Sequence, residues 1–258
     1  MTDIVPIRPS IKTQIKYRNA RQLNEVLGTL HMKMWSGIPD YMKTHNNGRL
    51  FIINHTTMGD VLGPHYTLNC LGVKPYYMAA EFLWEVPFAK KFFKRGKFIK
   101  VERGTANANK AYQQTLEILK SGGDVAMYPE GRIPKRDDSA DYLPSPIKNG
   151  AARLQIETGC SVYPVGHAGA PKATSGSIGK KVAGAITAEI RGVERVVYVG
   201  EPVEPRPEGP IDLMSLRETN PKMYRDIVDT DTGRLQEALT ESTQTAIDIR
   251  QQKTGKKR

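Results

Sequence analysis

One run of sequence decides the expected fold, Leu50-Phe51-Ile52-Ile53-Asn54-His55-Thr56-Thr57-Met58-Gly59-Asp60. Its first four residues are apolar and predict a buried strand, and the rest predicts the turn by which the chain leaves that strand. His55 lies five positions before Asp60, whereas neighbours on a helix are three or four apart, so the spacing indicates a turn in which Asp60 reaches back. Because imidazole titrates near neutral pH and a carboxylate fixes its tautomer, the pair is a candidate general base and its orienting residue. A plain strand-to-helix turn capped by the same two residues explains the run equally well.

Three more blocks occur further along the chain, each associated with a predicted strand. The run Tyr128-Pro129-Glu130-Gly131-Arg132 follows the strand-like residues 124–127. Between it and the first block lies Phe98-Ile99-Lys100-Val101-Glu102-Arg103-Gly104, and the last block is Ser161-Val162-Tyr163-Pro164-Val165. Four ordered blocks are a much more specific signal than a His and an Asp at one spacing.

Strands and helices alternate through the middle of the chain. We expect strands at 49–53, 75–79, 97–101, 124–128, 161–166, 183–191 and 195–200. We expect helices at 60–70, 87–95, 105–121, 147–158 and 231–250, with Gly122 ending the third of them. The alternation predicts an α/β fold, in which helices flank a mostly parallel mixed sheet of about seven strands. Residues 133–146 and 201–221 are expected to be irregular.

One continuous pattern predicts a single domain over residues 1–258. Within it we expect an N-terminal amphipathic helical element at 1–45, an α/β core at 46–205, and an irregular and helical segment at 206–258. Cys70 and Cys160 lack a metal-like spacing and are expected to be reduced core thiols of a cytoplasmic protein. We expect no signal peptide, and no stretch approaches the length of apolar sequence that spans a membrane.

The chain carries a net charge of +11, because it has 38 Lys and Arg residues against 27 Asp and Glu. This favours an anionic partner: a membrane surface with anionic lipid, a nucleic acid, or an acidic carrier. The helix expected at 11–36 is basic and amphipathic, so it fits a lipid interface as well as it fits packing on the core. A basic nucleic-acid-binding α/β protein is an alternative. However, aromatic residues do not alternate with the basic ones as base stacking would require.

Taken in order, the four blocks resemble those of the glycerophospholipid acyltransferase superfamily, and within it the 1-acylglycerol-3-phosphate (lysophosphatidic acid) O-acyltransferases. The resemblance covers residues 37–203. It implies transfer of a fatty acyl chain from acyl-CoA or acyl carrier protein to a lysophospholipid such as 1-acylglycerol-3-phosphate, by a protein bound peripherally to the membrane. Another lyso-lipid or a glycolipid is an alternative acceptor. A further interpretation is that the chain is a catalytically silent, lipid-binding relative of these enzymes. We expect no metal and no cofactor beyond the acyl donor.

The resemblance also implies which residues bind the acceptor. The Arg that closes the second block binds the acceptor's phosphate in this family, and here that residue is Arg103. A guanidinium suits this task because it grips phosphate through two parallel hydrogen bonds. Glu130 is expected to hold a glycerol hydroxyl, and the backbone at Gly131 allows the substrate to approach closely. His55 and Asp60 take the catalytic roles.

The third block departs from the family pattern, in which a small hydroxyl residue separates the Gly from the Arg. Here Arg132 follows the glycine directly, so it does not occupy the position that contacts the phosphate in the family, and Lys135 or Arg136 can share that contact. We count Arg132, Asn54 and Lys148 among the expected substrate-binding residues. Three other histidines have no partner in the sequence pattern and receive no role: His31, His45 and His167.

Overall fold

The computed structural model describes residues 48–56, 62–70, 72–84, 97–102, 107–133, 140–169 and 195–255. These residues form a sheet of six strands, in the order β3-β2-β4-β1-β5-β6. The strands are β1 (Arg49–Ile53), β2 (Tyr76–Ala80), β3 (Phe98–Val101), β4 (Val125–Met127), β5 (Ser161–Ala168) and β6 (Val196–Val199). Every neighbouring pair is parallel except β5 and β6, which run antiparallel. The predicted α/β fold with a mostly parallel sheet is therefore confirmed, and the seventh strand expected at 183–191 lies outside the described residues.

Strand β1 lies near the centre of the sheet, between β4 and β5. Successive side chains of a strand point to opposite faces, so a strand covered on both sides needs apolar residues at every position. Leu50 and Ile52 face one side, Phe51 and Ile53 face the other, and all four are fully buried. The apolar run that predicted this strand therefore also explains why the strand is central.

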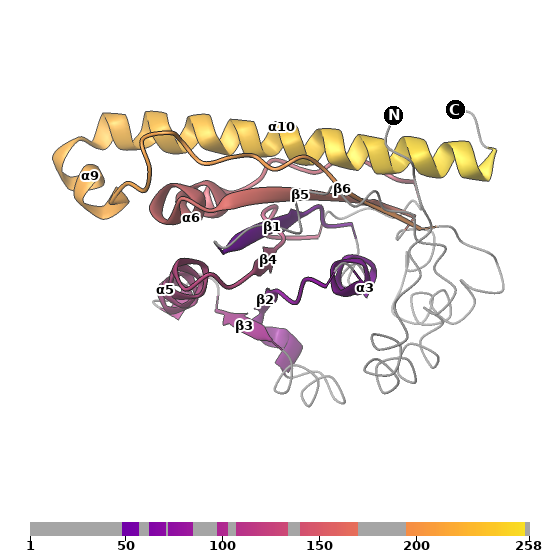
Figure 1. The fold of residues 1–258 in the computed structure, drawn as a ribbon, viewed down its shortest axis with the longest axis horizontal. Helices are drawn as coiled ribbons and strands as arrows, with labels where there is room; N and C mark the ends of the chain where they lie inside the picture. Colours follow the sequence, from indigo (N-terminus) through magenta and orange to yellow (C-terminus); the bar gives the residue numbers. More distant parts are fainter. Residues whose placement is uncertain are drawn as a thin grey trace.

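Helices cover both faces of the sheet (Figure 1). One face packs against α5 (Asn107–Lys120), α6 (Gly150–Thr158) and α10 (Pro221–Thr254). The other face packs against α3 (Leu62–Cys70). A single 3-10 turn, η2 (Glu81–Trp84), follows β2, and the short helix α9 (Leu213–Thr219) precedes α10.

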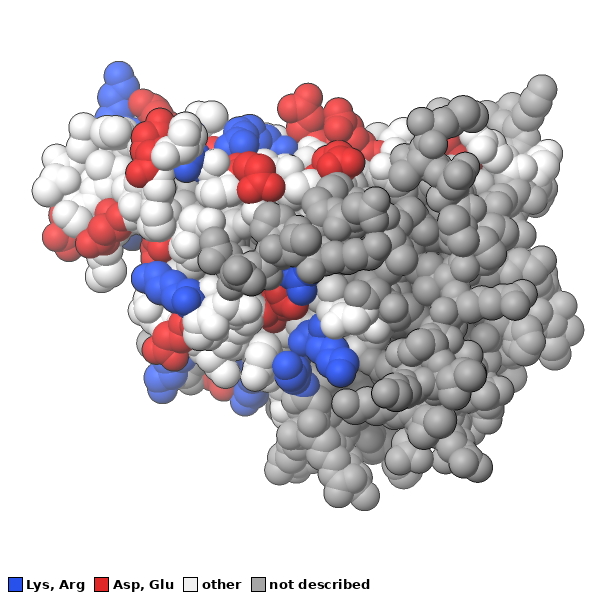
Figure 2. Space-filling view, in the orientation of Figure 1, with Lys and Arg blue, Asp and Glu red and all other residues white. Residues whose placement is uncertain are grey.

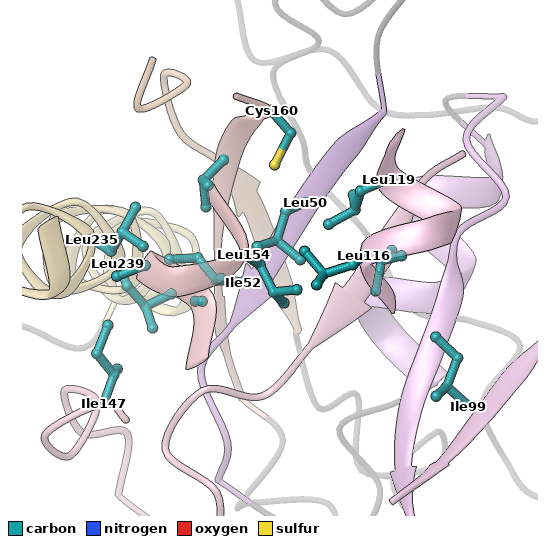
Figure 3. Packing of buried hydrophobic residues seen from close by; sticks show 14 of the residues in the cluster. Leu50, Ile52, Ile99, Leu116, Leu119, Ile147, Leu154, Cys160, Leu235 and Leu239 are labelled. Carbon is teal, nitrogen blue, oxygen red and sulfur yellow. The ribbon is translucent and has the colours of Figure 1, made fainter. Parts of the chain in front are cut away.

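The larger core cluster joins three helices to the sheet (Figure 3). The buried leucines that meet Leu50 and Ile52 in this cluster are Leu116 and Leu119 of α5, Leu154 of α6, and Leu235 and Leu239 of α10. Cys160 is a free thiol in the same cluster, and burial raises its pKa to about 11. The C-terminal helix thus shares a core with the central strands.

Helix α10 lies unusually close to the sheet at two glycines. A Cβ atom on Gly166 of β5 would lie 2.1 Å from the main-chain oxygen of Ser242, and one on Gly200 would lie 2.2 Å from Ser242 Oγ. Glycine in a strand often marks such a close approach of another backbone. These two positions allow α10 to lie directly on β5 and β6 (Figure 1).

The C-terminal segment is more helical than the sequence predicted. The helix expected at 231–250 spans Pro221–Thr254, and the stretch expected to be irregular contains α9. The N-terminal caps explain the difference: Asp212 accepts from the N–H groups of Met214 and Ser215, and Asn220 accepts from that of Met223. Pro221 occupies the first turn of α10, where a missing N–H costs nothing. Proline here starts a helix rather than prevents one.

Candidate active site

The first and third sequence blocks meet at one edge of the sheet. Strands β1 and β4 are adjacent and parallel, with Ile52 opposite Met127, so Asn54 and Tyr128 begin their loops side by side. In open α/β sheets, ligands bind outside the carboxyl ends of the strands. The candidate site therefore lies where the general principle places it, and residues 75 positions apart come into contact there.

The third block forms a tight turn after β4. The N–H of Gly131 donates to the carbonyl of Tyr128 at 3.1 Å, with Pro129 and Glu130 at the two central positions. Gly131 has a φ of 72°, which L side chains rarely adopt. A Cβ on Gly131 would lie 3.7 Å from Lys148 Cγ, an ordinary contact, so the backbone conformation rather than space requires the glycine.

Glu130 links this turn to the first block. Its Oε1 accepts the main-chain N–H of His55 at 2.6 Å, and its Oε2 accepts that of Ser145 at 2.8 Å. The side chain is buried, with 3% exposure. Burial raises the pKa of the carboxyl, while the two N–H donors act in the opposite direction. The residue predicted to hold an acceptor hydroxyl thus also holds the backbone of the predicted base.

The ring of His55 lies against Tyr128. The two ring centroids are 4.5 Å apart, with planes tilted by 35°. His55 is half-buried, and the carbonyl of the next residue, Thr56, accepts the hydroxyl of Tyr142 at 3.0 Å. The imidazole is therefore packed on one face, and its turn is held by Glu130 and by Tyr142, which is what a base with a defined orientation needs.

Asn54 joins β1 to the end of β5. Its Nδ2 donates to the carbonyl of His167 at 3.2 Å, and its Oδ1 accepts the N–H of His167 at 2.8 Å. The His167 Nε2 lies 2.8 Å from the carbonyl of Asn54, and because a carbonyl only accepts, Nε2 carries the proton. Asn54 is fully buried, so the structure gives its side chain a positioning part, and its expected contact with substrate stays a prediction.

Arg132 and Lys148 lie at the rim of the turn. Both side chains are exposed, and the main-chain N–H of Lys148 donates to the carbonyl of Pro129 at 2.8 Å. Two cations therefore flank the turn that contains Glu130. Their contact with a phosphate remains a prediction, although their position suits an anionic ligand.

Asp60 and Arg103 lie outside the described residues, so the His55–Asp60 pair and the phosphate contact stay predictions. The residue before Arg103 is described: Glu102 follows β3, the edge strand of the described sheet. There Lys100 Nζ lies 2.7 Å from Glu81 and 2.9 Å from Glu102. One cation of the basic stretch before Arg103 is therefore already paired within the chain.

Sequence reasoning missed several residues around the site. His167 received no role, yet it is buried and bonded to Asn54. Tyr142 and Ser145 lie in a stretch that was expected only to be an irregular loop, and they contact Thr56 and Glu130. His167 lies one residue past the strand expected at 161–166, and β5 is buried from Val162 to Ala168, so the apolar run of that strand was the available signal for its burial. No periodic pattern marks the other two.

The arrangement provides a histidine with a fixed backbone, a tight turn with a buried carboxylate, and exposed cations beside them. Such a set suits proton transfer from a bound hydroxyl next to an anionic group. Among the residues that the structure describes, no three His, Cys, Asp or Glu side chains gather as metal ligands would.

Comparisons with known proteins concern the family and the fold of the chain. A sequence model described as Acyltransferase matches residues 15–168, more than half of the chain. The fold is similar to that in the crystal structure of the 1-acyl-sn-glycerophosphate (LPA) acyltransferase PlsC from Thermotoga maritima. The TM-score is 0.50 and the identity 14%, over 88% of this chain and 83% of that one, so the likeness concerns the fold. No curated protein matches the chain.

Proposed function

This chain belongs to the acyltransferase family, and on that premise we propose that it moves a fatty acyl chain from a thioester to the free hydroxyl of a lysophospholipid. The proposed donor is acyl-CoA or acyl carrier protein, and the proposed acceptor is 1-acylglycerol-3-phosphate or a close relative. Family membership favours this over the nucleic-acid-binding alternative.

The observation that carries the proposal is the hydrogen bond between the His55 N–H and Glu130 Oε1, at 2.6 Å. Because this bond joins the predicted base to the predicted acceptor-binding turn, it supports a single site that contains both. A base must lie within hydrogen-bond reach of the proton that it removes, so the acceptor hydroxyl has to bind next to both blocks. The exposed Arg132 and Lys148 support an acceptor that carries a phosphate near this turn.

In the proposed mechanism, His55 takes the proton of the acceptor hydroxyl while Asp60 holds the imidazole in the required tautomer. The hydroxyl oxygen attacks the carbonyl carbon of the thioester and forms a tetrahedral intermediate. Collapse of the intermediate breaks the carbon–sulfur bond, and the imidazolium returns the proton to the departing thiolate. The products are an ester and a free thiol, and no covalent enzyme intermediate is needed. A positioned base of this kind contributes about 10²–10⁴ in rate.

The charge distribution supports action at an anionic lipid surface. Acidic and basic side chains are mixed along α10 (Figure 2). The surplus of positive charge in the chain therefore does not lie on this helix. The stretch 90–103 has one acidic residue, Glu102, against seven basic ones: Lys90, Lys91, Lys94, Arg95, Lys97, Lys100 and Arg103. Clustered cations attract anionic lipid and anionic donors.

Among the described residues, no helix combines the length and apolar character needed to cross a bilayer. We propose peripheral binding to the cytoplasmic membrane surface.

The test is thiol release from a long-chain acyl donor, measured with and without lysophosphatidic acid, with identification of the lipid product by mass spectrometry. Acyl-CoA and acyl carrier protein are compared as donors, and a glycolipid and a lyso-aminolipid as acceptors. Acceptor-dependent release that yields phosphatidic acid supports the proposal. Release only with an acceptor that lacks phosphate would replace the proposed acceptor, and no release with any combination would contradict the proposed function.

A further inference from the structure

Residues 140–149, here called the bridging segment, connect α10 to both turns of the site. On the site side, Tyr142 donates its hydroxyl to the carbonyl of Thr56 at 3.0 Å, and the N–H of Ser145 donates to Glu130 at 2.8 Å. These contacts reach the residue after His55 and the carboxylate that holds the His55 N–H. The segment thus fixes the histidine turn from two directions.

On the other side, α10 holds the bridging segment at two points. Gln236 Oε1 accepts the N–H of Ile147 at 2.8 Å. Arg250 Nη1 donates to Asp141 Oδ2 at 2.6 Å, while Oδ1 of the same carboxylate accepts the N–H of Gly169 at 2.6 Å. The two helix positions are 14 residues apart, about 21 Å along an α-helix. A rigid helix therefore anchors both ends of the segment.

The Asp141–Arg250 pair is almost fully buried, with side-chain exposures of 9% and 6%. Burying two charges costs several kcal/mol per ion in desolvation, so an apolar pair would often stabilise the fold as well or better. A buried pair with further hydrogen bonds instead fixes one geometry. Asp141 directly precedes Tyr142, so the geometry that it fixes is that of the tyrosine hydroxyl at the His55 turn.

We propose that α10 sets the orientation of His55 through the bridging segment, with Tyr142 as the positioning residue and Arg250 as its anchor. The inference rests on the proposed function for its effect on catalysis, but not for its effect on the His55 turn. A small misplacement of a catalytic group lowers turnover by up to about 10²-fold without affecting substrate affinity. The activity of the enzyme then depends on a helix that contributes no group to the chemistry.

The experiment compares Tyr142→Phe, Arg250→Gln and Arg250→Lys in the full chain. Tyr142→Phe removes only the hydroxyl, and Arg250→Lys keeps the charge and is expected to restore part of the loss. Arg206→Gln is the matched control, because Arg206 pairs with the buried Asp231 at 2.9 Å in the N-terminal half of α10. Asp231 lies 19 residues before Arg250, about 28 Å along the helix.

Two readouts are measured: kcat with KM for both substrates, and hydrogen exchange of the His55 main-chain N–H. We expect kcat to fall about tenfold to hundredfold in Tyr142→Phe and Arg250→Gln, with KM within about twofold and faster exchange at His55. The double variant should lose no more than the worse single one, because both act through one contact. Arg206→Gln should leave both readouts unchanged.

A Tyr142→Phe variant with unchanged exchange at His55 and kcat within about twofold of the wild type would overturn the inference. A rise in KM for the acceptor with kcat retained would also overturn it, because Tyr142 would then contact substrate. If the wild type transfers no acyl group, the proposed function fails separately, and exchange at His55 alone decides whether the segment holds the turn.

Discussion

The main-chain N–H of His55 donates to Oε1 of Glu130 at 2.6 Å, although 75 residues separate them in the sequence. The same carboxylate binds the N–H of Ser145 through its other oxygen. A carboxylate has two accepting oxygens and no donor when ionised, so it is the side chain that can bind two N–H groups at once. Glu130 therefore acts on the position of the histidine as well as on any acceptor that binds beside it.

We expect Glu130→Gln to lower kcat by about 10²-fold, because the amide nitrogen of Gln cannot accept a hydrogen bond and one main-chain N–H loses its partner. A buried unsatisfied donor costs about 1–3 kcal/mol, so the free energy of unfolding should fall by this amount. Steady-state kinetics and urea unfolding measure the two effects. Glu117→Gln, on the exposed side of α5, is the control and should change neither. A rise in acceptor KM with kcat retained would restrict Glu130 to binding the acceptor.

We expect Gly166→Ala to destabilise the protein by about 3 kcal/mol or more, because the new methyl group would overlap the main-chain oxygen of Ser242 and push α10 off the sheet. Gly233→Ala, within α10 itself, is the matched control. No atom lies within 4 Å of a Cβ at Gly233, so alanine should stabilise α10 by up to about 1 kcal/mol. Urea unfolding of the three proteins tests this. Equal stability of Gly166→Ala and the wild type would mean that α10 does not lie directly on β5.

Stability should fall on mild acidification because of His65 on α3. Burial lowers the pKa of this imidazole to about 4. Its Nδ1 has no hydrogen-bond partner in the described part of the chain, and its ring lies 5.1 Å from that of Tyr77. Between pH 6.5 and 4 the unfolded chain binds the proton more readily than the folded one, so stability decreases as pH falls through this window. His65→Leu should lose about 2 kcal/mol less than the wild type between pH 7 and pH 5 in urea unfolding. Parallel losses in the two proteins would contradict the lowered pKa.

We expect Arg103→Ala to raise KM for a phosphorylated acceptor by about tenfold or more, while KM for the acyl donor changes little, since hydrogen bonds to charged groups contribute about 1.5–3 kcal/mol. The measurement is acceptor-dependent thiol release with lysophosphatidic acid and with its dephosphorylated counterpart. An equal loss for both acceptors would mean that Arg103 does not bind the phosphate of the acceptor.

Local sequence was sufficient for the central strands. Residues 49–53 form the predicted strand because the four residues after Arg49 are apolar, and Gly122, with a φ of 82°, ends α5 as expected. The sequence analysis did not predict that His55 and Glu130 meet, because their contact depends on β1 and β4 being neighbours in the sheet.

The remaining contacts depend on the tertiary fold. Asp141 and Arg250 are 109 residues apart and lie in a polar loop and a helix whose sequence gives no sign of the pairing. Proline-rich composition concealed α9 and the start of α10, because caps such as Asp212 depend on single residues rather than on a repeating pattern. Residues that position a site are therefore harder to find from sequence than the residues that perform its chemistry.

The central claim is that His55 is the base of an acyl transfer. The most direct measurement is single-turnover acyl transfer to lysophosphatidic acid by the wild type and by His55→Ala, with circular dichroism to compare the folds. The variant keeps the main-chain N–H that binds Glu130, so the fold should persist while the rate falls by about 10²–10⁴. A His55→Ala protein that folds and transfers the acyl group at the wild-type rate would contradict the account.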